Sequence, residues 1–256
     1  MGEPIHTKGV YLEWWDGGDN LGDSLSQVVY SWMLERKHIS PEAQSKNAHL
    51  MTIGSLIGSN YFDATVWGSG IMCARDIVSL SRLAKYVKYD IRAVRGPITR
   101  EFLIEAGYKC PEVYGDPAVL MPLIYHPTNI EKKYKTSVIL HHLSSQEIPS
   151  DFHPINIKTT DYKSFISEVL SSELIISSSL HGIILAESYG IPCLFFNMDV
   201  LDQSIKYLDW YYSTGRYNVK MITDLNEITD PMSLPDLHNM QNTLIDVFPY
   251  DLWESV

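Results

Sequence analysis

The sequence predicts an α/β protein with two lobes, in each of which parallel strands alternate with helices. Apolar runs typical of strands alternate with segments of helical period along the chain, which is the pattern of parallel sheets crossed by helices. A polar, lysine-rich stretch at about 128–135 interrupts this alternation, and the same pattern restarts after it. Of the 256 residues, 45% are hydrophobic and 20% are charged, so the chain can bury a core and is not a disordered or fibrous protein.

The first lobe, residues 1–127, is expected to begin with a strand at 10–14. The loop 16–23 follows, and then a helix whose apolar residues share one face. Pro97 suits the first turn of a later helix and Gly107 suits its end. The remaining elements expected in this lobe are strands at 50–53, 64–67 and 86–94, and the helix at 97–106.

The second lobe, residues 136–256, repeats the same logic after the linker at about 128–135. Its expected strands are 138–140, 155–157, 174–177 and 193–196, and its expected helices are 162–170 and 180–189. Two further helical segments, 204–212 and 236–248, could cover either lobe.

Composition excludes several classes of protein. The formal net charge of −11 argues against a protein that binds nucleic acid, because such binding neutralises phosphates with Lys and Arg. Five arginines fall within 75–100, and this segment is either an anion-binding region or an ordinary solvated basic face. The three cysteines have neither disulfide-framework nor zinc-site spacing, and no metal is expected. Neither a leader nor an apolar run of about 20 residues is present, so we expect a cytoplasmic protein without a membrane-spanning segment.

Functional residues are expected where strands lead into helices, since ligands of parallel α/β sheets bind beyond the carboxyl ends of the strands. The strongest such turn is 177–182, where a buried strand ends in three serines and delivers His181 and Gly182 to a helix start. A histidine there suits a general acid. The alternative is that the serines only cap the helix and that His181 packs under the neighbouring lobe.

Other turns offer further candidates. Asn20 and Asp23 could hydrogen-bond sugar hydroxyls or cap the following helix. Arg95 ends a strand and could hold a carboxylate or phosphate with its bidentate fork. Arg100 could do the same or pair with a nearby glutamate.

Four more residues are ambiguous in the same way. Gly70 lies in a turn that permits close approach of a ligand, or simply in a turn, and Asp116 before a proline could be a turn-former. His141 and His142 are adjacent at a strand end and should face opposite ways, so at most one can face the cleft.

Tyr189-Gly190-Ile191-Pro192 after the His181 helix, and Lys206-Tyr207-Leu208-Asp209 before Ser213-Thr214-Gly215-Arg216, are similar to the shorter, succinoglycan-type branch of a known family. Five further segments, in their order and spacing, resemble that family as a whole, the polysaccharide pyruvyl transferases. The segments are Gly18-Asp19-Asn20-Leu21-Gly22-Asp23, Gly68-Ser69-Gly70, Val94-Arg95-Gly96-Pro97-Ile98-Thr99-Arg100-Glu101, Gly115-Asp116-Pro117-Ala118 and Ser178-Ser179-Leu180-His181-Gly182.

The resemblance implies a glycosyltransferase-B-like architecture of two Rossmann-type lobes with a cleft between them. It also implies transfer of pyruvate from phosphoenolpyruvate to a hexose of a surface polysaccharide, as a cyclic ketal and without a cofactor. By this likeness His181 is the general acid and Arg95 holds the anionic end of the donor. The substrate-binding residues expected beside them are Asn20, Asp23, Gly70, Arg100, Asp116, His142, Ser178, Ser179, Leu180, Gly182 and Arg216.

One position departs from the family pattern, since many members have an arginine where this chain has Ser179. Arg100 or Arg216 could supply the missing charge, or the amides at 180–182 could carry more of the anion binding. Two other functions stay open: a glycosyltransferase that uses a sugar nucleotide, and a glycan-binding relative without turnover. A lipid-linked acceptor would place the protein peripherally at the inner face of the plasma membrane.

Overall fold

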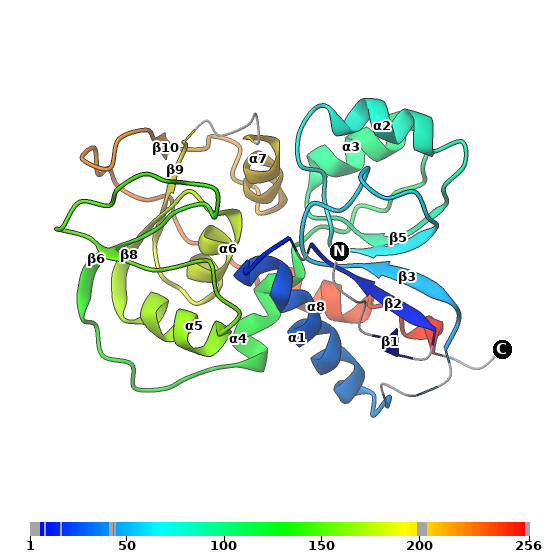
Figure 1. The fold of residues 1–256 in the computed structure, drawn as a ribbon, viewed down its shortest axis with the longest axis horizontal. Helices are drawn as coiled ribbons and strands as arrows, with labels where there is room; N and C mark the ends of the chain where they lie inside the picture. Colours follow the sequence, from blue (N-terminus) through cyan, green and yellow to red (C-terminus); the bar gives the residue numbers. More distant parts are fainter. Residues whose placement is uncertain are drawn as a thin grey trace.

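Two α/β lobes lie side by side, each built on one five-stranded sheet (Figure 1). The structure is a computed structural model that describes residues 6–7, 9–15, 17–40, 43, 45–198 and 204–253. Within this part of the chain, the helices are all too short or too polar to cross a bilayer. The two-lobed α/β fold with parallel sheets that the sequence predicts is confirmed.

The first lobe contains a sheet in which strands consecutive in sequence are neighbours, in the order β1-β2-β3-β4-β5. Only the pair β1 and β2 is antiparallel, so the carboxyl ends of β2 to β5 meet at one edge. Its elements are β1 (His6–Thr7), β2 (Val10–Glu13), α1 (Leu21–Arg36), β3 (Ala48–Met51), β4 (Ala64–Trp67), α2 (Asp76–Leu83), β5 (Tyr89–Ala93) and α3 (Pro97–Glu105).

Both faces of this sheet are covered by helices. Trp67 of β4 packs into the core that contains α1. Its neighbour Val66 packs into a separate cluster with Leu80 of α2 and Leu103 of α3. Figure 1 shows α1 on one side of the sheet and α2 and α3 on the other. Burial on both faces is the arrangement that parallel sheets require.

The second lobe contains a fully parallel sheet in the order β10-β9-β8-β6-β7. After β6, the chain adds β7 on one side of that strand and then adds β8, β9 and β10 in turn on the other side. The direction in which strands are added therefore reverses between β6 and β8. The elements from the end of the first lobe onward are η1 (Pro117–Leu120), α4 (Met121–Ile124), β6 (Tyr134–Ile139), β7 (His153–Pro154), α5 (Tyr162–Leu170), β8 (Ser172–Ser177), α6 (Leu180–Ser188), β9 (Cys193–Phe196), α7 (Ser204–Ser213), β10 (Met221–Ile222), α8 (His238–Asp246) and η2 (Tyr250–Leu252).

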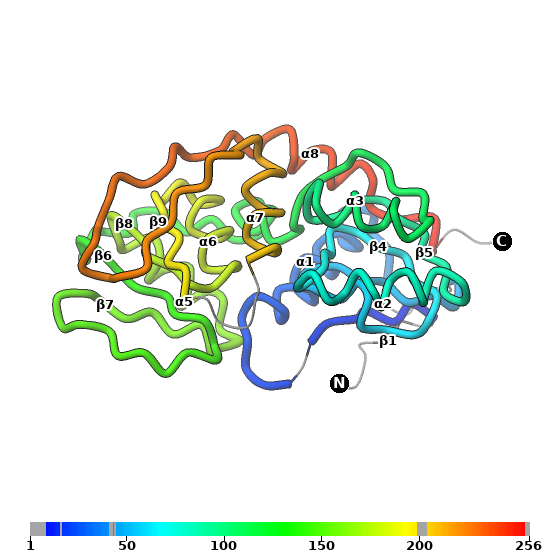
Figure 2. Tube along the Cα trace, turned by 90° about the horizontal axis from the view of Figure 1, so that it is seen from above, coloured from blue at the N-terminus to red at the C-terminus, as the bar shows by residue number. Residues whose placement is uncertain are grey.

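The end of the described chain returns to the first lobe, as the trace in Figure 2 also shows for α8. The Trp67 indole donates a 2.9 Å hydrogen bond to the Leu244 carbonyl of α8, and the Tyr250 hydroxyl donates one of 2.9 Å to the Met33 carbonyl of α1. In contrast, α7 packs against α3 and so joins the two lobes. The division of the chain at 128–135 stays a prediction, and the structure has neither helix nor strand between α4 and β6.

One apolar core extends through both lobes. It includes Leu25 of α1, Ile183 of α6 and Leu244 of α8. The short helix η1 contacts all three of these helices, and its Ala118 and Leu120 are fully buried. The lobes therefore share apolar contacts in addition to the chain segments that connect them.

The strand predicted at 155–157 is wrong. Ile155 and Ile157 are buried in the core, but the paired residues there are those of β7, His153–Pro154. The alternation of apolar residues at 155–157 therefore reports burial and not a strand ladder.

Candidate active site

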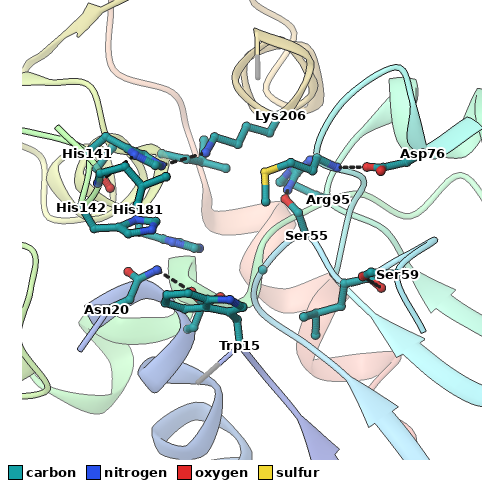
Figure 3. Close-up of a pocket in the computed structure, with 17 residues that line it drawn as sticks. Trp15, Asn20, Ser55, Ser59, Asp76, Arg95, His141, His142, His181 and Lys206 are labelled. Atoms are coloured by element: carbon teal, nitrogen blue, oxygen red, sulfur yellow. Dashed lines mark hydrogen bonds between the residues drawn. The ribbon is translucent and has the colours of Figure 1, made fainter. Parts of the chain in front are cut away.

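A pocket of about 420 Å³ lies between the lobes, within the range of about 300–1,000 Å³ typical of small-molecule sites. Residues that follow β2, β3 and β5 form one side of it, and residues that follow β6 and β8 form the other. The strand order reverses between β6 and β8, which is where parallel α/β sheets bind ligands. Figure 3 shows three histidines on one side of the pocket, Arg95 and Ser55 on the other, and Lys206 reaching in from α7.

The turn from β8 into α6 forms part of the second-lobe wall. The Ser179 amide donates a 3.0 Å hydrogen bond to Ser177 Oγ, and this hydroxyl donates a 2.9 Å bond to the Ser179 carbonyl. Ser179 is the N-cap of α6, but its side chain makes no cap hydrogen bond, so the first amides of the helix remain available to an anion. Ser179, Leu180 and His181 all line the pocket.

The His181 imidazole is seated against α1 of the other lobe. A Cβ atom at Gly22 would lie 1.7 Å from Nδ1 of the ring, so only glycine leaves room for it. On the other side, Nε2 lies 3.6 Å from Oδ2 of Asp116, and within the described residues neither atom has a hydrogen-bond partner. The ring is therefore held in position between Gly22 and Asp116, with Nε2 buried and facing the Asp116 carboxyl group.

Asp116 lies behind this histidine and does not itself line the pocket. Its carboxylate is fully buried and caps η1, because Oδ1 accepts a 3.0 Å hydrogen bond from the Ala118 amide. Asp116 thus forms the turn before Pro117 and also faces His181.

Arg95 lies at the opposite side of the pocket, with its side chain 0% exposed. Its Nε lies 3.3 Å from Oδ2 of Asp209, Nη1 donates a 2.9 Å hydrogen bond to Ser55 Oγ, and Nη2 donates to the Ile71 carbonyl. Gly70 makes room for this group, since a Cβ there would lie 2.5 Å from Cζ of Arg95. Gly70 therefore supports the packing of Arg95 and does not line the pocket.

Asp209 of α7 connects this arginine to the start of α3. Its Oδ1 accepts hydrogen bonds from the amides of Ile98 at 2.9 Å and Thr99 at 3.1 Å, and its Oδ2 accepts one of 2.6 Å from the Thr99 hydroxyl. A Cβ at Gly96 would lie 2.1 Å from the Asp209 carbonyl oxygen. Burial raises the pKa of Asp209, and the charge of Arg95 opposes this shift.

Asn20 and Asp23 line the pocket from the beginning of α1. The helix starts at Leu21, so the predicted loop is shorter and Asp23 lies in the first turn. Asn20 occupies the N-cap position, yet its Nδ2 donates a 2.5 Å hydrogen bond to Asp23 Oδ2 and its side chain makes no cap hydrogen bond. Burial raises the pKa of the Asp23 carboxyl to about 6.

Lys206 was not assigned to the site from the sequence, although its side chain is buried and lines the pocket. Its Nζ lies 3.4 Å from Nε2 of His141. Burial, with the neighbouring Arg95 charge, lowers the pKa of this amine to about 7. The available signal was the spacing of Lys206 and Asp209, two charged residues one turn apart on an otherwise aromatic helix face.

Both adjacent histidines line the pocket, so the expectation that at most one faces the cleft is wrong. The reason is that β6 ends at Ile139, and the alternation of a strand no longer applies at His141 and His142. The His142 ring lies 5.3 Å from the ring of Trp15, which is 41% exposed and also lines the pocket.

Two predicted arginines lie away from the pocket. Arg100 pairs with Glu112 at 3.1 Å on the surface. Arg216 forms a bidentate pair with Glu187, with distances of 2.6 and 2.8 Å, and its guanidinium lies 4.6 Å from the Tyr211 ring centre. Neither guanidinium lies where it could replace the arginine that many family members have at the position of Ser179.

Ser178 and Gly182 serve packing. Ser178 Oγ accepts a 2.8 Å hydrogen bond from the His141 amide, which links the turns after β6 and β8. A Cβ at Gly182 would lie 2.4 Å from Ser177 Oγ, so this glycine lets α6 approach β8. Neither residue lines the pocket.

A family model described as polysaccharide pyruvyl transferase matches residues 61–200, more than half of the 256 residues. The chain belongs to the polysaccharide pyruvyl transferase family. The activity that this family name describes is pyruvyl transfer to a polysaccharide. The matched range of the family contains Arg95, Asp116 and His181, whereas Asp23 and Lys206 lie outside it.

Two relatives of this pyruvyl transferase family member cover most of the chain. The uncharacterized protein L143 of Acanthamoeba polyphaga mimivirus is 26% identical over 261 residues, which cover 96% of this chain and 88% of that protein. The succinoglycan biosynthesis protein ExoV of Rhizobium meliloti (strain 1021) is 25% identical over 210 residues, which cover 79% of this chain and 64% of that protein. The resemblance to the family and to its succinoglycan-type branch is confirmed.

A solved structure supports the fold. The crystal structure of an uncharacterized protein from Klebsiella pneumoniae subsp. pneumoniae NTUH-K2044 superposes with a TM-score of 0.55 at 16% sequence identity. The superposition covers 86% of this chain and 95% of that one. At this identity the likeness concerns the architecture alone.

Proposed function

We propose that this pyruvyl transferase moves pyruvate from phosphoenolpyruvate to a hexose of a surface polysaccharide or its lipid-linked precursor, forming a cyclic ketal and releasing phosphate. The observation that carries the proposal is a single pocket lined by His181 of one lobe and Arg95 of the other. The family supports pyruvyl transfer as the reaction class. The pocket has the size for a small anionic donor beside a sugar.

His181 acts as the general acid in this proposal. Its imidazolium donates a proton to the methylene carbon of phosphoenolpyruvate, which becomes the methyl group, and positive charge develops at the central carbon. The Asp116 side chain lies 3.6 Å from Nε2 and holds the imidazole in position for this step.

Two sugar hydroxyls then complete the reaction. The first attacks the central carbon and loses its proton, the C–O bond to phosphate breaks, and phosphate leaves with the bonding electrons. The second hydroxyl closes the ring at the same carbon and loses its proton. The Asp23 carboxyl, with a pKa of about 6, is largely ionised at pH 7 and accepts a hydroxyl proton. No cofactor enters this sequence.

The acceptor lies beside Trp15 and Asn20 in this proposal. The exposed Trp15 indole offers an apolar face to a sugar ring, and the Asn20 amide hydrogen-bonds its hydroxyls. Tyr207, Trp210 and Tyr211 of the aromatic-rich helix are buried in the core and are not available for stacking. A lipid-linked acceptor would place the enzyme at the inner face of the plasma membrane.

The test is an assay of the purified protein with phosphoenolpyruvate and candidate oligosaccharide acceptors. We expect phosphate release that depends on the acceptor, and an acceptor product whose mass increases by one carboxyethylidene group. Release of a nucleotide from sugar nucleotides, without phosphate release from phosphoenolpyruvate, would instead identify a glycosyltransferase. Binding of glycans with neither reaction would identify a non-catalytic relative.

A further inference from the structure

The charge of Arg95 reaches the pocket through the groups that surround its guanidinium. Arg95 borders the pocket, yet its side chain is 0% exposed. Nη1 donates a hydrogen bond to Ser55 and Nη2 donates one to the Ile71 carbonyl, while Nε faces the buried carboxyl group of Asp209. A ligand in the pocket therefore cannot touch the guanidinium unless one of these groups moves.

Ser55 is the group that stands between Arg95 and a ligand. It follows β3, its side chain is partly buried, and it lines the pocket. Ile71 and Asp209, the other two residues around the guanidinium, do not line the pocket. Figure 3 shows Ser55 on the Arg95 side of the pocket, opposite the three histidines.

The hydrogen bond between Arg95 and Ser55 has one possible direction. A guanidinium has donors and no acceptor, so Ser55 Oγ accepts the 2.9 Å bond from Nη1. The hydroxyl hydrogen of Ser55 is then left for another acceptor, and the described part of the chain provides none. Because its oxygen already accepts a bond from a cation, this hydroxyl is polarised and becomes a stronger donor.

The carboxyl groups that line the pocket near Ser55 have other partners. Asp76 Oδ2 accepts hydrogen bonds of 2.7 and 3.0 Å from the amides at 72–73. Asp23 Oδ2 accepts the hydrogen bond of the Asn20 amide group. The hydroxyl hydrogen of Ser55 is therefore available to an oxygen of a ligand.

The turn after β4 fixes the backbone on both sides of Ser55. The fully buried Ser69 donates a 2.9 Å hydrogen bond from Oγ to the Gly54 carbonyl, and the same Oγ accepts one of 3.2 Å from the Leu56 amide. The Gly70 amide donates a further bond of 3.1 Å to the Gly54 carbonyl. Gly54 has a φ of +115°, a conformation that favours glycine. The Ser55 hydroxyl is thus placed before a ligand binds.

We propose that Ser55 binds the anionic end of the donor by donating its hydroxyl hydrogen to an anionic oxygen, and that Arg95 acts on the donor through this hydroxyl. An anionic oxygen is the acceptor that this donor favours, because the guanidinium lies directly behind it. Arg95 can then keep its buried contacts while its charge strengthens the bond to the ligand. This proposal rests on the proposed function, in which phosphoenolpyruvate is the donor.

The first test measures the Kd for phosphoenolpyruvate by calorimetric titration of the wild type and of Ser55→Ala. We expect Ser55→Ala to raise Kd about 10–100-fold, the range for one hydrogen bond to a charged group. Ser55→Thr keeps a hydroxyl and should bind close to the wild type. If Ser55→Ala binds as tightly as the wild type or more tightly, the guanidinium serves the donor without the hydroxyl and the proposal is wrong.

Ser59 provides the matched control, because it lines the same pocket from the same loop. Its hydroxyl donates a 2.9 Å hydrogen bond to the Leu56 carbonyl, so its hydrogen is used within its own turn. We expect Ser59→Ala to bind phosphoenolpyruvate like the wild type. An equal rise in Kd for Ser55→Ala and Ser59→Ala would mark a general effect on this loop and would overturn the proposal.

A second background separates direct contact with the donor from an effect on Arg95. The double variant Arg95→Met with Asp209→Leu removes both buried charges and leaves neither unpaired. We expect it to bind phosphoenolpyruvate more weakly than the wild type. Adding Ser55→Ala should raise Kd again, by a smaller factor than in the wild type, because the hydroxyl still donates but is no longer polarised.

Two results in this background would contradict the proposal. If Ser55 only positioned Arg95, adding Ser55→Ala would change nothing once Arg95 is absent. If the double variant bound no donor at all, Arg95 would have to contact the donor directly. A wild type that binds no phosphoenolpyruvate would instead refute the proposed function itself.

Discussion

Two ion pairs cross between the lobes beside the pocket, and they differ in how completely their atoms are satisfied. In the first, Arg95 and Asp209 are both fully buried and make five hydrogen bonds with other residues, and only Nε of Arg95, 3.3 Å from Asp209, lacks a hydrogen bond in the described residues. In the second, His181 and Asp116 lie 3.6 Å apart, and the two facing atoms have no hydrogen-bond partner in the described residues. The first pair stabilises the geometry of the pocket, whereas the second leaves two buried polar atoms without a hydrogen bond beside it.

This difference separates two roles that the sequence assigned to the same small donor. A group that must move a proton needs a nitrogen without a fixed hydrogen bond; His181 lines the pocket, and its buried Nε2 has no hydrogen-bond partner in the described residues. The Arg95 guanidinium, with both Nη atoms hydrogen-bonded and a buried carboxylate partner on α7, instead fixes its surroundings in place and adds positive potential to the pocket.

The largest effect on activity should come from a substitution in the second pair, His181 and Asp116. His181→Asn removes the acid, and we expect kcat for phosphate release to fall about 10²–10⁴-fold while the melting temperature changes little. The exposed His238→Asn is the control and should keep full activity. A His181→Asn enzyme with wild-type kcat would show that the proton comes from another group.

Substitutions in the first pair, Arg95 and Asp209, should mainly change the stability of the fold. Asp209→Leu leaves Arg95 buried without its carboxylate, and we expect the free energy of unfolding, measured by urea titration, to fall by about 3–5 kcal/mol. The double variant Arg95→Met with Asp209→Leu should recover most of this loss, because no unpaired charge remains. If the single variant loses less than the double, the pair does not hold α3 and α7 together as described.

The close contact between Gly22 and the His181 ring predicts a smaller effect on kcat. Gly22→Ala introduces a Cβ where the ring lies, 1.7 Å from Nδ1, and displaces the imidazole. We expect kcat to fall about 10²-fold, the cost of misplacing a catalytic group by about 1 Å. In the His181→Asn background the same change should have no further effect on kcat; an additive loss would mean that Gly22 acts independently of the ring.

The smallest effect is expected at Arg100. Its partner Glu112 has a side chain that is 73% exposed, and the pair lies outside the pocket. We expect Arg100→Ala to change the free energy of unfolding by no more than about 1 kcal/mol, and to leave KM for phosphoenolpyruvate unchanged. A KM increase of tenfold or more would place Arg100 at the donor and contradict the assignment of the pocket walls.

The fold could be predicted from the sequence where an apolar run corresponds to a strand that is buried on both faces of its sheet. The runs at 64–67 and 193–196 are strands with the expected bounds, because short apolar runs in parallel sheets are buried on both faces. The helix α2 was not predicted, although its sequence carries a helical signal: Ile77, Leu80 and Leu83 recur every three residues, and Leu80 and Leu83 are buried.

The site was predictable only in part, because a turn after a strand can be located from sequence but a contact between lobes cannot. His181, Arg95, Asn20 and Asp23 lie at such turns and line the pocket as expected. Lys206 lies on a helix that follows β9 and reaches the pocket because α7 crosses to α3. The Asp209 carboxylate, which occupies Arg95, comes from the same helix.

The shared core around η1 restricts how a ligand can enter. A rigid-body hinge between the lobes would pull α1 and α6 away from η1 and expose to water the side chains, such as Leu120, that all three bury together. Large-scale clamshell closure is therefore disfavoured, and access is left to smaller rearrangements of side chains and loops at the mouth, around Trp15 and His142. The binding site should thus be largely preformed, and the small-angle X-ray scattering profile of the protein should be the same with and without donor.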